Sequence, residues 1–342
     1  MRAKRAATIR SVRNRIRSCS SGRSGYPRYD ELGRIRQLRS HRDFIYKGRC
    51  MNHDEYALHK LAISGEIKRR ILEHRLSLSR RKAMAVSSWA ATPKSLNLIA
   101  QGDSWFDYPL PILSHSDVLA HLKEAQKPPL ILRLAHHGEA AEAMLGVKKL
   151  HLLLEQLDAA VGEDAFDAIL FSGGGNDLVG DQFRIWLNNA AGVSSDPGRG
   201  LRQARVEGVL TVVRGAYEDL IEARNKIEAK HNCSIPIFVH SYDFAIPSGL
   251  GVCGAGPWLM PGLADRGWSN ADGQTIVRNL LVQFAALLDD LQKNAHGFHH
   301  VRTQGTLRPD QWDNEIHPTS EGFGAIAARF VESLRAVFPN RI

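Results

Sequence analysis

The chain has 342 residues, of which 43% are hydrophobic, and a mean hydropathy of −0.27, values typical of a soluble globular protein. No stretch approaches the roughly 20 apolar residues of a membrane-spanning helix, and no apolar segment of a secretory signal follows the early charges. The cysteines are widely spaced, which excludes a disulfide scaffold or a cysteine zinc site and predicts free thiols in a reducing compartment. We therefore expect a cytoplasmic protein. The cysteines are Cys19, Cys50, Cys233 and Cys253.

The net charge of +9 is unevenly distributed along the chain. Residues 1–95 contain 24 Lys and Arg against 7 Asp and Glu, whereas the rest of the chain carries a net charge of −8. Residues 1–50 are rich in Arg, Ser and Gly without clean periodicity, which predicts disorder. Residues 54–83 have apolar residues at roughly helical spacing between basic clusters, which favours a helix, although Gly65 weakens it. We expect a basic N-terminal extension over residues 1–94.

Three roles are open for this extension. It can be a solvated, weakly ordered arm. It can contact nucleic acid or an anionic membrane through residues 1–83, because its positive charge would attract either. It can also be a targeting segment, or translation upstream of a true start at Met84, since initiation there would leave the rest of the chain intact. The Arg-rich first 29 residues, which lack acidic side chains, also fit a transit peptide.

From residue 95 onward, short apolar segments alternate with amphipathic ones. Such alternation is typical of a parallel sheet that helices cover on both faces. We therefore expect one α/β domain over residues 95–342, with about five parallel strands. Strands are predicted at 96–100, 130–134, 167–171, 235–239 and 298–301, and helices at 117–125, 147–160, 200–230, 277–292 and 322–337.

Three polar blocks lie where ligands bind in such sheets, at the carboxyl ends of the strands. Gly102-Asp103-Ser104-Trp105 ends the first strand, Gly174-Gly175-Asn176-Asp177 follows the third, and His317 lies in the loop before the last helix. A serine in such a turn can be a nucleophile if a base and an oxyanion site converge on it. Each residue alone also fits a structural role, as a turn or cap residue. Their order along the chain favours a shared site.

This ordered set resembles the GDSL/SGNH hydrolase superfamily over about residues 95–340. The second block of that family is most similar to residues 134–138 here, and the last block to residues 314–318. The resemblance implies a flavodoxin-like three-layer sandwich with Ser104 as the nucleophile and His317 as the base.

The same resemblance implies an oxyanion hole. Its donors would be the backbone N–H groups of Ser104 and Gly138 and the side-chain amide of Asn176. Glycine suits the second position because no Cβ blocks approach to the amide, although Gly146 is a nearby alternative. Each such donor can supply about 3 kcal/mol of transition-state stabilisation.

One position departs from the family pattern. The residue three before His317, where the family has aspartate, is Asn314, with Asp313 before it and Glu315 after it. An asparagine can orient the imidazole but cannot stabilise the imidazolium by charge. Either Asp313 or Glu315 takes the role through a shifted loop, or the enzyme runs as a Ser–His dyad with the Asn314 carbonyl as the orienting group. We favour Asp313.

Two long loops, residues 179–200 and 241–272, are expected to shape the substrate site. Trp105, Tyr242 and Trp258 are the predicted substrate-binding residues, although tryptophans can equally serve to pack a loop. The histidine pairs at 136–137 and 299–300 lack a third ligand at metal-binding spacing. No metal or organic cofactor is therefore expected.

The sequence thus predicts hydrolysis of a carboxylic ester by a Ser–His centre, with a small-molecule, glycan or lipid ester as the substrate. Two alternatives stand beside it: a non-hydrolytic acyl- or glycan-binding module, and a nucleic-acid-associated protein that acts through the basic extension. The particular ester and the oligomeric state are left open by the sequence.

Overall fold

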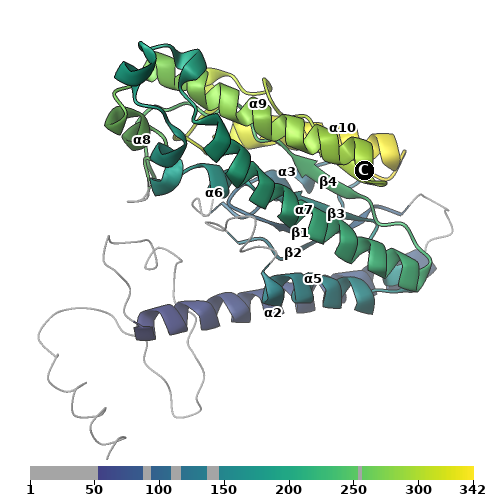
Figure 1. Cartoon of the computed structure of the whole chain (residues 1–342). Helices are drawn as coiled ribbons and strands as arrows, with labels where there is room; N and C mark the ends of the chain where they lie inside the picture. Colours follow the sequence, from purple (N-terminus) through teal and green to yellow (C-terminus); the bar gives the residue numbers. More distant parts are fainter. Residues whose placement is uncertain (1–52, 88–93, 109–116, 137–145, 253–255) are drawn as a thin grey trace, which may run out of the picture. The chain divides into compact units, whose positions relative to one another are not determined.

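A computed structural model describes residues 53–87, 94–108, 117–136, 146–252 and 256–342 of the chain. In this part, five strands form one parallel sheet in the order β2-β1-β3-β4-β5 (Figure 1). The predicted α/β fold is therefore confirmed, and the strand order is that of flavodoxin-like folds. The strands are β1 (Asn97–Gly102), β2 (Leu130–Arg133), β3 (Ala168–Ser172), β4 (Ile237–His240) and β5 (Phe298–Val301).

The helices form two layers over the sheet. Helices α5, α7 and α9 contact one another in a row, whereas α3 packs against α10. The α-helices are α2 (His53–Ser87), α3 (Val118–Leu122), α5 (Val147–Ala159), α6 (Gly175–Leu178), α7 (Gln203–His231), α8 (Met260–Asp265), α9 (Asn270–Asn294) and α10 (Ser320–Val337). Short 3-10 helices are η2 (Gly162–Asp164), η3 (Asp181–Trp186), η4 (Ala190–Val193), η5 (Pro197–Arg199) and η6 (Pro309–Gln311).

The central strands are apolar because the two layers bury both of their faces. Every residue of β1, β3 and β4 is buried, which explains why these segments are nearly continuous apolar runs rather than alternating patterns. In the register of the sheet, Gly102 at the end of β1 pairs with Ser172 at the end of β3. The chain segments that leave these two strands therefore start side by side at one edge.

Helix α9 begins seven residues before its predicted start at residue 277, because polar residues supply its first turns. The Ser269 side chain accepts a hydrogen bond from the backbone N–H of Asp272 and caps the helix. Helix α10 starts in the same manner, with Thr319 accepting from the N–H of Gly322. A search for apolar periodicity alone does not detect a first helical turn that is made of polar residues.

Helix α2 packs against the sheet, in contrast to the solvated arm considered from the sequence (Figure 1). His74 is buried, its Nε2 lies 2.9 Å from Asn97 Oδ1, and its ring stacks on Phe166 at 5.4 Å. Leu78 is buried as well, and Lys82 pairs with Asp164 at 2.7 Å. The compact unit of the described chain thus includes α2, and the boundary predicted between residues 94 and 95 lies inside it.

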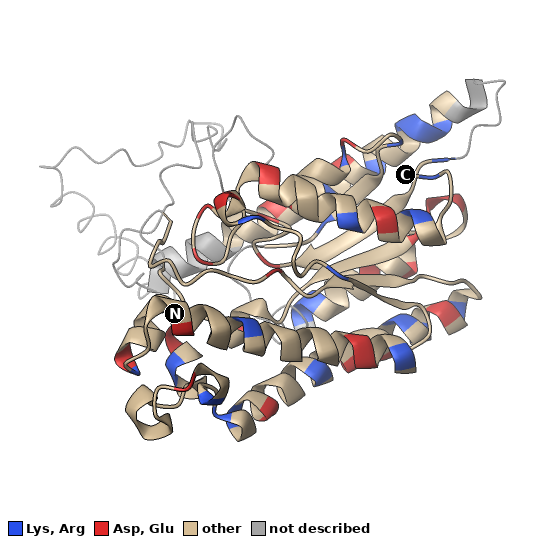
Figure 2. Cartoon of the chain, turned by 90° about the horizontal axis from the view of Figure 1, so that it is seen from above, with Lys and Arg blue, Asp and Glu red and all other residues tan. Residues whose placement is uncertain are grey.

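Charges of both signs are distributed along the helices of this unit (Figure 2). In the described ranges, no helix is long and apolar enough to cross a lipid bilayer. Residues 1–52 lie outside the described part, so the nucleic-acid or membrane contact of the basic extension stays a prediction.

We expect His74→Ala to lower the free energy of unfolding by about 2–3 kcal/mol. The change removes a stacked ring and leaves the buried Asn97 carbonyl without this partner. Leu72→Ala on the same helix is the matched control, because Leu72 is 59% exposed and its loss should cost less than about 0.5 kcal/mol. Urea denaturation of both variants measures the difference. Equal midpoints would contradict the docking of α2.

Candidate active site

The turn that carries Ser104 is held by close contact between two strand ends. A Cβ on Gly102 would lie 2.8 Å from Ser172 Cβ and 2.9 Å from the Ser172 carbonyl oxygen, so only glycine fits there. The chain then turns at once, with the backbone N–H of Phe106 donating to the carbonyl of Asp103 at 3.1 Å. Ser104 therefore lies at the carboxyl edge of the sheet.

The Asp103 carboxylate lies beneath Ser104 and joins the ends of three strands. It is only 2% exposed. Its Oδ1 accepts hydrogen bonds from the backbone N–H of Trp105 at 3.0 Å and from Ser172 Oγ at 2.8 Å, and its Oδ2 accepts from the Tyr242 hydroxyl. Ser172 Oγ also lies 2.7 Å from His240 Nε2. This buried network ties β1, β3 and β4 together.

Burial sets the protonation states in this network. It raises the pKa of Asp103 to about 6, against the opposing hydrogen bonds from Tyr242 and Ser172. It lowers the pKa of His240 to about 3, so this ring is neutral at pH 7. His240 Nδ1 accepts from the backbone N–H of Tyr242 at 3.2 Å, so Nε2 carries the ring hydrogen and donates to Ser172. Ser172 in turn donates to Asp103.

The structure brings the serine and histidine singled out from the sequence together across 213 positions of the chain. Ser104 Oγ lies 2.8 Å from His317 Nε2, and both residues are buried. On the other side of the ring, His317 Nδ1 lies 2.9 Å from Asn314 Oδ1. The three side chains form a continuous hydrogen-bonded line, which is the arrangement of a nucleophile, a base and an orienting group.

The orientation of the Asn314 amide follows from its other partners. Its Nδ2 donates to the Tyr108 hydroxyl at 2.9 Å and to Asp313 Oδ2 at 3.2 Å. Its Oδ1 accepts from the backbone N–H groups of Ile316 and His317. The amide oxygen therefore faces the ring and receives the hydrogen on Nδ1, so Nε2 is the nitrogen without a hydrogen and accepts the hydrogen bond of the Ser104 hydroxyl.

Asn314 rather than the favoured Asp313 thus contacts the imidazole. The reason is local, because the Asn314 oxygen also caps the turn that leads to His317 and is held beside the ring by it. Asp313 binds the next groups outward from the imidazole. Its Oδ2 accepts a hydrogen bond from the Tyr108 hydroxyl at 3.2 Å. All three candidates could be identified from the sequence, but the direction in which each side chain points could not be predicted from it.

Glu315, the third candidate, points the opposite way and organises a loop. It is fully buried and accepts hydrogen bonds from four backbone N–H groups of the segment 249–260. Its own N–H donates to the Leu250 carbonyl at 3.3 Å. Adjacent residues therefore make different contacts: Asn314 binds the His317 ring, and Glu315 binds the backbone at Gly249 and at 258–260. The four donors are Gly249, Trp258, Leu259 and Met260.

Aromatic rings fix the position of the His317 side chain. Tyr108 stacks on the imidazole with ring centroids 4.3 Å apart, and Trp258 meets it edge-on at 5.4 Å. Trp105 is buried and donates from Nε1 to the Ile316 carbonyl at 3.0 Å, which links the turn that carries Ser104 to the loop that carries His317. Trp105 and Trp258 thus have packing contacts as well as a place at the site.

A cavity of about 40 Å³ lies beside Ser104. Of the predicted substrate-binding residues, Trp105 and Tyr242 line it, whereas Trp258 contacts His317 instead. Asn176, on α6, also lines it; Gly138 lies outside the described residues. Most of the remaining wall is apolar: Leu178, Val179, Ala245, Leu259, Val277, Leu280, Leu281 and Ile316. An open depression of about 730 Å³ along α7 also reaches Asn176.

Tyr242 adopts a backbone conformation that the sequence did not predict. Its φ is +57°, in the left-handed region that costs a non-glycine residue free energy and that is frequent at functional sites. Thr303 Oγ1 donates to its carbonyl at 2.6 Å, and its hydroxyl accepts from the N–H of Gly175. A Cβ on Gly175 would lie 2.7 Å from Tyr242 Cζ, so the tyrosine packs directly on the turn that carries Asn176.

Within the described residues, no group of three or more His, Cys, Asp or Glu side chains is arranged to hold a metal ion. The site that the fold and these contacts define is a buried Ser–His–Asn line at the carboxyl edge of a parallel sheet.

Comparisons of the chain with protein-family models and with curated proteins find no match. Several solved structures are similar. A lipase from a goat rumen metagenome is 15% identical, with 70% of this chain and 97% of that chain covered and a TM-score of 0.44. A phospholipase A1 from Streptomyces albidoflavus is 14% identical, with coverages of 70% and 99% and a TM-score of 0.41. A member of the lipolytic protein G-D-S-L family from Veillonella parvula is 14% identical, with coverages of 70% and 97% and a TM-score of 0.38.

The buried Asp103 predicts a pH-dependent stability. Because its pKa is raised from 3.8 to about 6, its contribution to stability is fully present below pH 3.8 and is lost as the pH rises through 6. The free energy of unfolding of Asp103→Asn, relative to the wild type, should therefore rise by about 3 kcal/mol between pH 3 and pH 7.5. Denaturant titrations at both pH values measure this change. A relative free energy that stays constant with pH would contradict it.

Proposed function

We propose that this chain is a serine hydrolase of the GDSL/SGNH type, which transfers the acyl group of a carboxylic ester to water. The observation that carries the proposal is the hydrogen-bonded line from Ser104 Oγ through the His317 ring to Asn314 Oδ1. A serine in contact with a correctly oriented imidazole is what acyl transfer requires. The apolar cavity next to the hydroxyl supports the same reading, because an acyl group needs such a space.

In the proposed reaction, Ser104 Oγ attacks the ester carbonyl carbon while His317 Nε2 accepts the hydroxyl proton. The tetrahedral intermediate collapses when His317 returns this proton to the leaving alcohol. Water, activated by the same ring, then attacks the acyl-serine and releases the acid. The proposed donors to the oxyanion are the backbone N–H groups of Ser104 and Gly138 and the side-chain amide of Asn176.

Asn314 gives this centre a neutral orienting group. Because its amide oxygen faces Nδ1, it holds the tautomer in which Nε2 can act as a base. It adds no negative charge next to the imidazolium that forms during the reaction, although the Asp313 carboxylate is one hydrogen bond away. We expect a working enzyme that is slower than one with a carboxylate in contact with the ring.

The cavity favours a short acyl group. Its volume of about 40 Å³ is roughly three to four times the ~10–15 Å³ of such space that holds one water molecule, so an acetyl group fits better than a long chain. The alcohol part can be larger, because the open depression that reaches Asn176 gives it room. An acetylated or similarly short-chain ester is therefore the proposed substrate class.

A fluorophosphonate probe should label the chain on Ser104 and on no other residue. The probe reacts with a serine whose hydroxyl is activated by a base, and Ser104 is in contact with His317. Mass spectrometry of the digested protein locates the modified peptide. Ser104→Ala should lose both the labelling and the release of p-nitrophenol from p-nitrophenyl acetate.

The matched control is Ser320→Ala. Ser320 Oγ also contacts a histidine, His121 at 3.4 Å, but it does not line the cavity or bind Asp103, so labelling of Ser104 should persist. A folded wild-type protein that is not labelled would contradict the proposal and would favour the non-hydrolytic acyl- or glycan-binding module.

Substitutions at positions 313 and 314 separate the two orienting candidates. Asn314→Leu removes the acceptor for Nδ1 and should lower kcat by about 100-fold or more, because the ring loses its tautomer and position. Asp313→Asn leaves that contact intact and should lower kcat by less than about 10-fold. Steady-state kinetics with p-nitrophenyl acetate compare the two. A larger loss for Asp313→Asn would mean that the carboxylate is the orienting group during the reaction.

A further inference from the structure

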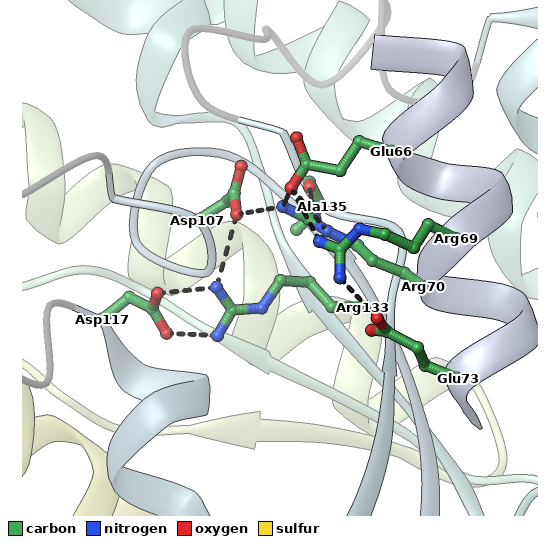
Figure 3. Close-up of polar contacts among 8 residues, drawn as sticks. All are labelled: Glu66, Arg69, Arg70, Glu73, Asp107, Asp117, Arg133 and Ala135. Carbon is green, nitrogen blue, oxygen red and sulfur yellow. Dashed lines mark hydrogen bonds and ion pairs between the residues drawn. The ribbon is translucent and has the colours of Figure 1, made fainter. Parts of the chain in front are cut away.

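Arg70, on helix α2, connects three separate parts of the chain (Figure 3). Its Nη2 donates to Asp107 Oδ1 at 2.9 Å, and its Nη1 donates to the Ala135 carbonyl at 3.0 Å. Its Nε and Nη2 also bind Glu66 Oε1, one turn earlier on the same helix. The Arg70 side chain is 17% exposed, so these bonds form in a mostly buried place. All three nitrogens of the Arg70 guanidinium group therefore donate hydrogen bonds.

The Ala135 carbonyl needs a partner because β2 is an edge strand of the sheet. The N–H groups of Leu134 and His136 donate to β1, to the carbonyls of Ala100 and Gly102. Backbone groups alternate in direction along a strand, so the Ala135 carbonyl points outward. A buried carbonyl without a partner is costly, and Arg70 supplies the partner from outside the sheet.

Asp107 belongs to the nucleophile turn, three residues after Ser104. Its Oδ1 also accepts from Arg133 Nη1 at 3.3 Å (Figure 3). Arg133 in turn makes a two-point contact with Asp117, at 2.8 and 2.9 Å, and Asp117 caps helix α3. The outer side of the nucleophile turn is thus held by two arginines, one from the sheet and one from α2.

We propose that Arg70 is a positioning residue for the reaction. From α2, it fixes the turn Ser104–Asp107 relative to the end of β2, and with it the place of the nucleophile. The inference rests on the proposed serine hydrolase function. It gives a role to helix α2, which lies outside the part of the chain that resembles the GDSL/SGNH hydrolases, since that part begins at about residue 95.

The effect of Arg70 should appear in the chemical step. Its guanidinium binds Asp107 and Ala135 on the outer side of the turn, and Arg70 does not line the cavity, so its loss should leave substrate binding unchanged. A displacement of about 1 Å in a catalytic group can lower the rate by about 100-fold. We therefore expect a loss in kcat of about 10- to 100-fold, with KM nearly constant.

The experiment compares Arg70→Met, Arg70→Lys and Arg69→Met in the full chain. Arg69→Met is the matched control: it changes the charge of the same helix by the same amount, but Arg69 is 59% exposed, and its ion pairs among the described residues are with Glu66 and Glu73. Two measurements are made on each variant. One is steady-state kinetics with p-nitrophenyl acetate, and the other is hydrogen exchange of the amides at 104–108 and 134–136.

The expected result is a lower kcat and faster exchange in both segments for Arg70→Met. Arg70→Lys should recover part of the kcat, because an ammonium can reach one of the two partners. Arg69→Met should match the wild type in both measurements. A wild-type kcat in Arg70→Met would overturn the inference, whether or not exchange changes. An equal loss in Arg69→Met would also overturn it, because the effect would then come from the charge of the helix.

The failure of this inference differs from the failure of the proposed function. If the wild type neither turns over the ester nor reacts with a fluorophosphonate, the hydrolase assignment fails and the positioning role falls with it. If the wild type is active and Arg70→Met is equally active, only the role of Arg70 is wrong.

Discussion

The site depends first on a carboxylate that is buried where three strands end. Asp103 is removed from water, and its two side-chain oxygens accept from three donors in different parts of the chain: the turn that carries Ser104, the end of β3 and the segment after β4. Burial of this acid is unfavourable for its charged form, as its raised pKa indicates. The same hydrogen bonds fix the backbone of the turn that carries Ser104, which is what the buried carboxylate contributes to the site.

A second layer of polar contacts connects this centre to the outside of the domain. Tyr108 lies between the two levels, since its ring stacks on His317 and its hydroxyl bonds with Asn314 and Asp313. Further from the site, Asp107 accepts hydrogen bonds from Arg133 on β2 and from Arg70 on α2. Charged groups at these positions are largely buried and paired, and paired buried charges hold a defined geometry more strictly than exposed ones.

The sequence was sufficient to predict the α/β fold and the contact between Ser104 and His317, but not the finer contacts around them. Apolar runs of four to six residues predicted the five strands because burial on both faces leaves that pattern. Ser104 and His317 could be found because each follows a chain segment that ends at the same edge. The direction of Asn314, Asp313 and Glu315 could not, since one turn of backbone decides it. The docking of α2 was also missed. Apolar residues such as Ile71 and Leu78 take part in it, but polar residues such as His74 and Arg70 make specific contacts that a search for apolar periodicity does not count.

Glu315 has a consequence for how the proposed active site can diversify. The loop that contributes Leu259 to the cavity wall is held by the Glu315 carboxylate, two residues before His317, the proposed base. Any insertion or deletion that refits this loop to a new acyl group must preserve four backbone contacts to one side chain, or it will pull on the imidazole as well. If the proposed function holds, acyl specificity and turnover are coupled through Glu315, and a change of substrate is easier to make from the opposite wall, on α9, where Val277, Leu280 and Leu281 face the cavity.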